Sequence, residues 1–155
     1  MAITEQMRTD VTSLYVALFG RAPEADGFGY WVSEASNGTS IKRIAQEMYD
    51  TTAARAIYPL YLTNEEIVSK FYTNVLGRSA DTDGLNYWTA KLNNGESVGE
   101  LIVELVTAVL NYGGSDAAAL TSKTLLENKI SASLQYVVDN GGNDVTVATN
   151  LITAI

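Results

Sequence analysis

Apolar residues recur at spacings of three and four along most of the chain, which is the period of a helix with one face on a core. The first such face runs from Met7 to Leu18 and ends at Gly20, a residue type that suits a helix C-terminus. Faces of the same kind are predicted at about 26–36, 40–48, 63–76, 83–93, 97–110 and 122–139. The pattern predicts an all-α fold of about seven or eight helices.

One stretch between these predicted helices occurs twice. The sequence GRAPEADGFGYW at residues 20–31 and the sequence GRSADTDGLNYW at residues 77–88 share the same Gly, Arg, Asp, Gly, Tyr and Trp positions. The register of apolar residues also holds on both sides of the stretch. We infer a tandem duplication of a three-helix unit, with copies at about 10–58 and 67–114.

The C-terminal third, about 116–155, does not repeat the motif and is predicted to hold further helices of the same domain. The sequence NGGND at 140–144 is typical of a turn. The last eleven residues, VTVATNLITAI, contain β-branched residues that also suit a strand. Because no partner strand is evident elsewhere in the chain, we predict a final helix.

Composition indicates a single globular domain over residues 1–155. The sequence is 46% apolar, and no apolar run approaches the roughly 18 residues of a membrane span. The net charge is −8, from 10 basic and 18 acidic residues, and the basic residues form no cluster. Nucleic acid and anionic membrane surfaces are therefore not expected as partners. The N-terminus does not resemble a signal peptide, so the protein is either cytoplasmic or exported by a signal elsewhere.

Cysteine and histidine are both absent from the sequence. Their absence excludes thiol nucleophiles, Ser-His-Asp triads and the usual zinc sites. Carboxylates, tyrosine, lysine, arginine and hydroxyl groups remain for chemistry, and cations that prefer oxygen ligands, such as calcium, remain possible. Paired carboxylates could hydrolyse a glycosidic bond, but no feature of the sequence places two acids across a cleft. We therefore do not expect an enzyme.

The duplicated stretch has a purely structural interpretation. Gly20 and Gly77 would end one helix in a positive-φ conformation, and Asp26 and Asp83 would cap the next. The Tyr-Trp pairs would then pack the short helix against its neighbours. In this interpretation the repeat is a duplicated chain corner, and no ligand is needed to account for its residues.

Two interpretations of the same stretch involve a ligand. Asp81 and Asp83 lie two residues apart in a turn with Asn86 nearby, and such oxygen-rich loops can hold calcium, although the spacing is not that of an EF-hand. Alternatively, aromatic faces stack on sugar rings while amide and guanidinium groups bond to hydroxyls. The candidates for glycan binding are Arg78, Tyr87 and Asn94, with Arg21, Tyr30 and Asn37 in the first copy.

The motif from Tyr15 to Trp31, repeated from Tyr72 to Trp88, resembles a domain of large secreted bacterial proteins that has long been labelled as of unknown function. It is most similar to the N-terminal anchoring region of S-layer proteins of Gram-negative bacteria, Campylobacter-type in particular, and of related RTX-like exported proteins. The stretch LLENKISASLQYVV at 125–138 also resembles the segment that follows the repeats in that family.

The resemblance implies properties that composition alone does not indicate. Such proteins are secreted by a type I route with a C-terminal signal, and their N-terminal region anchors an S-layer lattice to the O-antigen of lipopolysaccharide. The implied partners are therefore a surface polysaccharide and other copies of the parent protein in the lattice. The family's calcium-binding nonapeptide repeats do not occur in this sequence, which leaves a calcium role in doubt.

Three functions remain open from the sequence. The first is a glycan-binding anchor for a surface protein. The second is a structural or self-association module in which the repeat only builds helices. The third, which we consider the weakest, is a carbohydrate-active enzyme that uses carboxylates.

Overall fold

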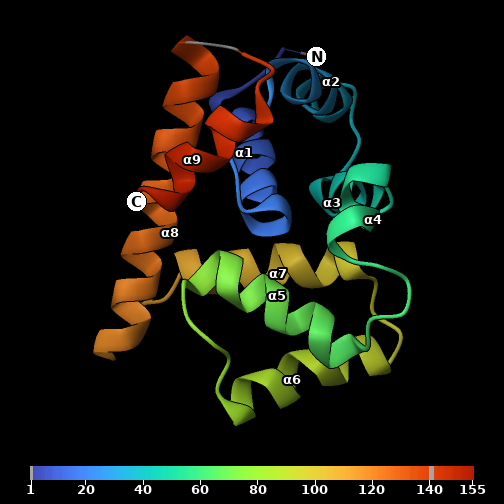
Figure 1. Ribbon diagram of the computed structural model, residues 1–155, viewed down its shortest axis with the longest axis vertical. Coiled ribbons are helices and arrows are strands. Elements are labelled where there is room, and N and C mark those ends of the chain that lie inside the picture. Colours follow the sequence, from blue (N-terminus) through green and yellow to red (C-terminus); the bar gives the residue numbers. More distant parts are fainter. Residues whose placement is uncertain (1, 140–141) are drawn as a thin grey trace.

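The computed structural model describes residues 2–139 and 142–155 of the chain, and these residues form nine α-helices and no strand (Figure 1). The predicted all-α fold is therefore confirmed. The helices are α1 (Glu5–Phe19), α2 (Ala25–Ser36), α3 (Ile41–Tyr49), α4 (Thr52–Ile57), α5 (Asn64–Leu76), α6 (Thr82–Asn93), α7 (Val98–Leu110), α8 (Ala117–Asp139) and α9 (Val145–Thr153).

The two repeated units have matching helix ends. α2 and α6 each contain 12 residues and begin at equivalent positions of the repeat. α1 and α5 both end at a glycine in the left-handed conformation, with φ of 63° at Gly20 and 69° at Gly77. α3 and α7 both begin after a serine, Ser40 or Ser97, whose hydroxyl accepts a hydrogen bond from a backbone N–H in the first turn. The sequence repeat thus corresponds to a repeat of local structure.

Equivalent positions of the two units face one another. The Asn74 side chain donates a hydrogen bond of 3.0 Å to the carbonyl of Ala17, and the two residues are 57 positions apart, which is the length of the repeat. α3 likewise packs against α7, where Gly99 is the counterpart of Lys42. Contacts between equivalent residues are expected of two units related by an approximate two-fold axis.

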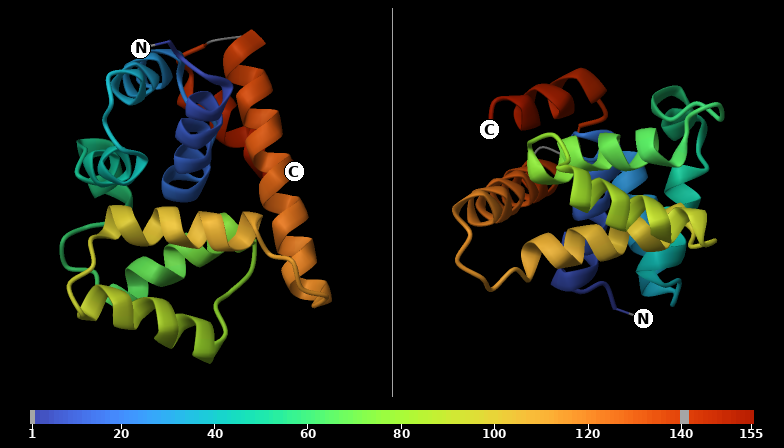
Figure 2. Two further views of the ribbon diagram at one scale, coloured as in Figure 1. Left: turned by 180° about the vertical axis from the view of Figure 1, so that it is seen from behind. Right: turned by 90° about the horizontal axis from the view of Figure 1, so that it is seen from below.

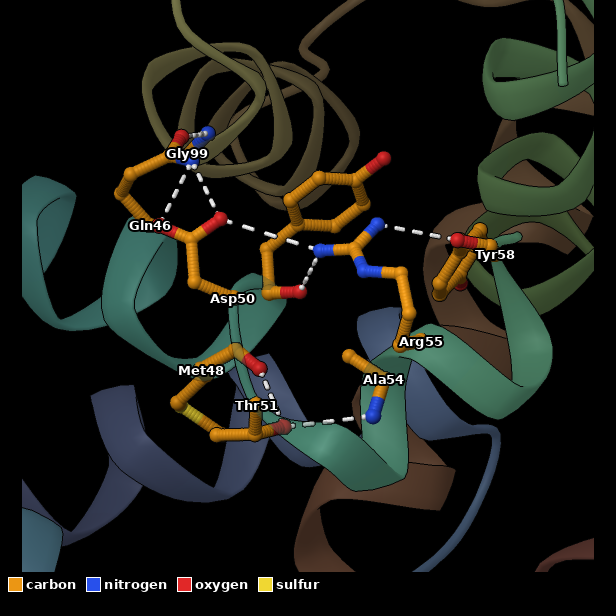
Figure 3. A network of polar contacts seen from close by, with 9 residues as sticks. Gln46, Met48, Asp50, Thr51, Ala54, Arg55, Tyr58 and Gly99 are labelled. Carbon is orange, nitrogen blue, oxygen red and sulfur yellow. Dashed lines mark hydrogen bonds and ion pairs between the residues drawn. The ribbon is translucent and has the colours of Figure 1, made fainter. Parts of the chain in front are cut away.

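A polar network holds α3, α4 and α7 together (Figure 3). The side-chain oxygen of Gln46 accepts a hydrogen bond of 2.8 Å from the backbone N–H of Gly99, in the first turn of α7. The Arg55 guanidinium donates to the carbonyl of Tyr58 at 2.9 Å and lies 3.7 Å from an Asp50 carboxylate oxygen. Gln46 thus satisfies a helix N–H group that has no partner within α7.

One core connects both units with the C-terminal helices. α8 runs along one side of the molecule, first past α5 and α7 and then past α1 (Figure 1, Figure 2). Its inner face contributes Leu126 and Ile130, and α9 adds Ile152 to the same core. Tyr58 is fully buried at the junction of the units, and its hydroxyl donates a hydrogen bond of 2.5 Å to the carbonyl of Leu18.

Several elements differ from the sequence-based expectation. α4 was not expected, and α8 begins at Ala117 rather than near Ser122. The ambiguous C-terminal segment forms the helix α9 and not a strand. Of the turn predicted at 140–144, residues 140 and 141 lie outside the described residues. Within the described ranges, none of the helices is both long and apolar enough to cross a bilayer.

The expectation that Asp26 and Asp83 cap helices is wrong. The N-cap positions of α2 and α6 are occupied by Glu24 and Asp81, and neither makes a side-chain capping hydrogen bond. Asp26 and Asp83 lie in the first turn of their helices, where a carboxylate still interacts favourably with the helix dipole. The carboxylates of Glu24 and Asp81 make no capping bond and lie instead beside a tyrosine of the preceding helix, Tyr15 or Tyr72.

Candidate functional site

Each acidic turn of the repeat closes on a tyrosine of the preceding helix. In the first unit the Tyr15 hydroxyl donates a hydrogen bond of 3.1 Å to a carboxylate oxygen of Glu24, and Arg21 pairs with the other oxygen. In the second unit burial raises the pKa of Tyr72, and the negative charge of the neighbouring Asp81 raises it further. The two corners therefore share a tyrosine–carboxylate pair.

The repeated glycine of the DG sequence makes room for this pair. A Cβ atom at Gly27 would lie 2.2 Å from the Tyr15 hydroxyl oxygen, and one at Gly84 would lie 2.2 Å from that of Tyr72. Neither glycine has a positive φ, so the requirement is one of space and not of backbone conformation. The sequence could not indicate this role, because the tyrosine lies twelve residues upstream.

The structural interpretation expected both rings of each Tyr-Trp pair to pack inward, but only the tryptophan of each pair does so. Trp31 and Trp88 are partly buried and pack against the core. Trp31 lowers the pKa of the nearby Tyr15 and Trp88 lowers that of Tyr72, in both cases against the larger effect of burial. The neighbouring tyrosines, in contrast, lie on the surface. The exposed fraction is 57% for Tyr30 and 60% for Tyr87, because adjacent helix positions cannot face the same side.

The structure does not bring the six candidate glycan-binding residues into one site. α2 and α6, which carry the two Tyr-Trp pairs, lie at opposite ends of the molecule (Figure 1). Arg21 is buried with 8% of its surface exposed, and its guanidinium is occupied by Glu24. Arg78 is exposed and donates a hydrogen bond of 3.3 Å to Ser122 on α8. Asn37 and Asn94 are exposed C-cap residues of α2 and α6.

One of the six candidates, Tyr87, lines a groove between the repeat units. The groove has a volume of about 480 Å³ and lies between α3 of the first unit and α6 and α7 of the second. The Tyr87 and Trp88 rings are 5.0 Å apart and nearly perpendicular, and Lys91 Nζ lies 5.4 Å and 5.8 Å from their centroids. The lining residues are Lys42, Tyr87, Trp88, Lys91, Val103, Glu104, Thr107 and Ala108.

The charges in this groove are paired. Glu104 of α7 lies between two lysines, 3.3 Å from Lys91 Nζ and 3.8 Å from Lys42 Nζ. The contact with Glu104 raises the pKa of Lys91, so this lysine stays charged at neutral pH. Glu96 lies close to Glu104, and its pKa is raised first by burial and then by Glu104. The groove therefore presents two lysines that are held in place by one glutamate.

A second hollow of about 270 Å³ adjoins the first, because Val103 and Thr107 line both. It lies between α1, α3 and α7 and is lined by both polar and apolar residues. Gln6 donates a hydrogen bond of 2.7 Å to Asp10, whose pKa is raised by burial. The groove beside Tyr87 and this hollow form one continuous depression, which we call the groove across α7. One half carries the aromatic rings of Tyr87 and Trp88, and the other half carries the Gln6 amide and the Asp10 carboxylate.

Several groove residues were missed by sequence reasoning. Lys91 follows Tyr87 by one helical turn, so the pair could have been recognised as one face of α6. Lys42 and Glu104 carried no such signal, because they meet only through the packing of α3 against α7. Glu104 did match Glu47 in the repeat register, but that match alone indicates no contact.

The structure adds no support for a calcium site at Asp81 and Asp83. Both residues are exposed at the start of α6, and Asp81 adjoins the Tyr72 hydroxyl. Across residues 2–139 and 142–155, no group of three or more aspartates or glutamates is placed to hold a metal ion.

The fold and the groove define an all-α protein built from a duplicated three-helix unit with an open groove between its copies. Residues 45–109 are similar to the family described as Domain of unknown function (DUF4214). This segment runs from α3 into α7 and includes the second copy of the motif. No curated protein and no solved structure matches the chain significantly.

Proposed function

We propose that this chain is a non-catalytic anchoring module of a secreted, S-layer-like surface protein, and that it binds the O-antigen glycan of lipopolysaccharide. The observation that carries the proposal is the groove across α7, in which an exposed tyrosine, Tyr87, stands beside a partly buried tryptophan and paired polar groups. Sugar rings stack on such aromatic faces, and their hydroxyls bond to amide, carboxylate and ammonium groups.

The charge of the molecule favours a neutral section of polysaccharide as the ligand. The chain carries a net charge of −8, so it repels the phosphates of the lipid A and core region unless divalent cations bridge the two. The O-chain lies beyond those phosphates, and the two lysines of the groove share the single carboxylate of Glu104. The resemblance of the repeated motif to anchoring regions of S-layer proteins favours the same ligand.

Binding without cleavage agrees with the geometry of the aromatic half of the groove. Glycoside hydrolysis requires one carboxyl group that donates a proton and a second placed across the scissile bond. The carboxylate lining this half is Glu104, which is ion-paired with Lys42 and Lys91. Each oxygen of the Glu104 carboxylate faces a lysine ammonium, so we assign this side chain a role in positioning Lys91.

The test is a calorimetric titration of the 155-residue chain with smooth lipopolysaccharide and with rough lipopolysaccharide that lacks the O-chain, each with and without calcium. We expect binding to the smooth form alone. Equal binding to both forms, or to neither, would contradict the proposal. Loss of binding on chelation alone would instead indicate a calcium-dependent contact, with Asp81 and Asp83 as the first ligands to test by substitution.

The repeat provides a matched control for this titration. Tyr87→Ala should weaken binding by roughly fivefold or more, taking as a guide the about 1–3 kcal/mol that stacking of a nucleobase on an aromatic side chain contributes. Tyr30→Ala removes an equally exposed tyrosine at the equivalent position outside the groove, and it should leave affinity unchanged. Equal losses in both variants would show that the groove is not the binding site.

A further inference from the structure

The hollow between α1, α3 and α7 contains a carboxylate at a position where the other copy of the repeat holds a buried apolar residue. Asp10 of α1 is half-buried and lines the hollow. Its counterpart, 57 positions later, is Ile67 of α5, which is 7% exposed and belongs to the core. The next position is a fully buried valine in both units, Val11 and Val68. The repeat therefore indicates that the fold itself does not need an acid at this position.

The surroundings of Asp10 are unfavourable for an ionised group. Burial raises its pKa, and the hydrogen bond from Gln6 offsets this effect only in part. That bond, of 2.7 Å, goes to one carboxylate oxygen. Across residues 2–139 and 142–155, no second residue donates a hydrogen bond to this carboxylate, and no lysine or arginine forms an ion pair with it. Asp10 therefore has capacity left to accept hydrogen bonds from a ligand.

The hollow around Asp10 combines this acceptor with an apolar lining. Its volume is about 270 Å³, and the apolar side chains of Leu14, Ile41 and Leu110 contribute to its surface. An ionised carboxylate can only accept hydrogen bonds, so the ligand group beside it has to donate them. Two neighbouring hydroxyls of a sugar ring meet this requirement, and the carbon face of the same ring suits the apolar lining.

The Asp10 hollow and the Tyr87 half of the groove lie on two sides of one ridge of α7. Val103 and Thr107, one helical turn apart, form this ridge and line both halves. In the left view of Figure 2, α7 lies in front, with α6, which carries Tyr87, below it and α1, which carries Asp10, above it. A ligand that contacts both Tyr87 and Asp10 has to lie across the ridge, which a chain of linked sugars can do.

We propose that the Asp10 hollow is a second sugar subsite of the groove across α7, filled by a unit whose adjacent free hydroxyls donate to the Asp10 carboxylate. The inference rests on the proposed function and deepens it. The ligand is a stretch of at least two linked sugar units, one stacked on Tyr87 and another at Asp10. A unit whose hydroxyls are methylated or acetylated cannot donate and leaves Asp10 without its partners, so the hollow selects against it.

The test measures affinity as a function of fragment length. O-chain is released from smooth lipopolysaccharide by mild acid, separated by size and titrated calorimetrically into wild type, Asp10→Ile and Tyr87→Ala. For wild type, affinity should rise with length until both halves of the groove are filled. Asp10→Ile should remove most of that rise, a loss of roughly tenfold or more for the longer fragments. Tyr87→Ala should weaken binding at every length.

Three controls separate this role of Asp10 from a structural one. Asp10→Ile introduces the residue that the matching position already holds, so its Tm should equal or exceed that of wild type. Asp10→Asn keeps an acceptor oxygen without the charge, and its affinity for long fragments should be intermediate. Glu5→Gln removes one negative charge from the same helix outside the groove, and it should leave every affinity unchanged.

The results distinguish the second subsite from the proposed function as a whole. If Tyr87→Ala weakens binding but Asp10→Ile binds long fragments as tightly as wild type, the second subsite is wrong and the glycan groove stands. Affinity that does not change with fragment length would have the same meaning. If Asp10→Ile lowers the Tm, Asp10→Asn takes its place, and an affinity equal to wild type in that variant would overturn the subsite. If wild type binds no O-chain fragment of any length, the proposed function itself is contradicted.

Discussion

The close approach of the two units at Gly99 yields a quantitative prediction for Gly99→Ala. A Cβ atom at this position would lie 2.5 Å from the backbone nitrogen of Gln46 and 2.7 Å from the carbonyl oxygen of Lys42. Both obstacles are backbone atoms of α3, so no side-chain rotation relieves the contact. α3 and α7 must move apart, which also strains the hydrogen bond from the Gly99 N–H to Gln46.

The magnitude follows from three contributions. Overpacking of a well-packed contact costs about 1–3 kcal/mol, and the upper half applies where backbone must move. The weakened hydrogen bond adds about 0.5–1.5 kcal/mol. Alanine offsets about 1 kcal/mol through its higher helix propensity. We therefore expect Gly99→Ala to lower the free energy of unfolding by about 1.5–3.5 kcal/mol, which corresponds to a loss of roughly 3–14 °C in Tm for a chain of this size.

Urea denaturation followed by circular dichroism measures this change, and Gly29→Ala is the matched control. Gly29 also lies within a helix, α2, but a Cβ atom there would meet nothing within 4 Å. The control should gain about 0.5–1 kcal/mol from helix propensity and reduced unfolded-state entropy. If Gly99→Ala is as stable as the wild type, the α3–α7 contact is looser than we describe.

Two further predictions concern the repeated corner and the acid pair. Gly84→Ala should lower the free energy of unfolding in urea by about 1–2 kcal/mol, because its Cβ atom would collide with the Tyr72 hydroxyl. The double variant with Tyr72→Phe should recover part of that loss, and strictly additive losses would disprove the collision. Folding raises the pKa of Glu96, so its protonated form is favoured in the native state and stability is lost as pH rises through that pKa. Glu96→Gln should therefore have a higher Tm than wild type at pH 7, with the gap closing below about pH 4.5; an unchanged or lower Tm at pH 7 would contradict this sign.

Local signals made most helix ends predictable. Ser40, Thr63 and Ser97 cap helices through hydrogen bonds to residues within the same turn, and Gly20 and Gly77 end helices through their own φ angles. Such interactions depend on residues only a few positions apart, so the sequence displays them directly. The duplication is visible for a related reason, because its motif recurs as a contiguous stretch of residues at a fixed spacing.

Features that depend on tertiary contacts were not predictable in this way. α4 is six residues long and is followed by Pro59, so its apolar pattern is too short to recognise. Its Thr51 cap and the burial of Tyr58 under α1 hold it in place. The same limit applies to the groove, because Lys42 and Glu104 belong to different units and their pairing depends on how α3 crosses α7.

The duplicated motif does not produce two equivalent corners, and the C-terminal segment is the reason. The start of α2 is covered by this segment: the N–H of Ala25 donates to the carbonyl of Gly142 at 2.9 Å, and that of Asp26 donates to the Asn143 side chain at 3.0 Å. α6 lies at the other end of the molecule, away from α9 and the segment that precedes it (Figure 1). A segment present once per chain can thus bind the helix start at one corner of a duplicated pair, while the two repeated tyrosines, Tyr30 and Tyr87, stay similarly exposed.

The buried arginine of the first corner strengthens this difference. The Arg21 guanidinium carbon lies 5.3 Å from the ring centroid of Tyr15 and 5.1 Å from that of Phe19. The ion pair with Glu24 holds the guanidinium in this position. The position equivalent to Phe19 is Leu76, which offers no aromatic face, and Arg78 is exposed. The same motif has thus become a fixed structural corner in the first unit. In the second unit it leaves an aromatic pair beside the inter-unit groove, which is why we place the binding function there.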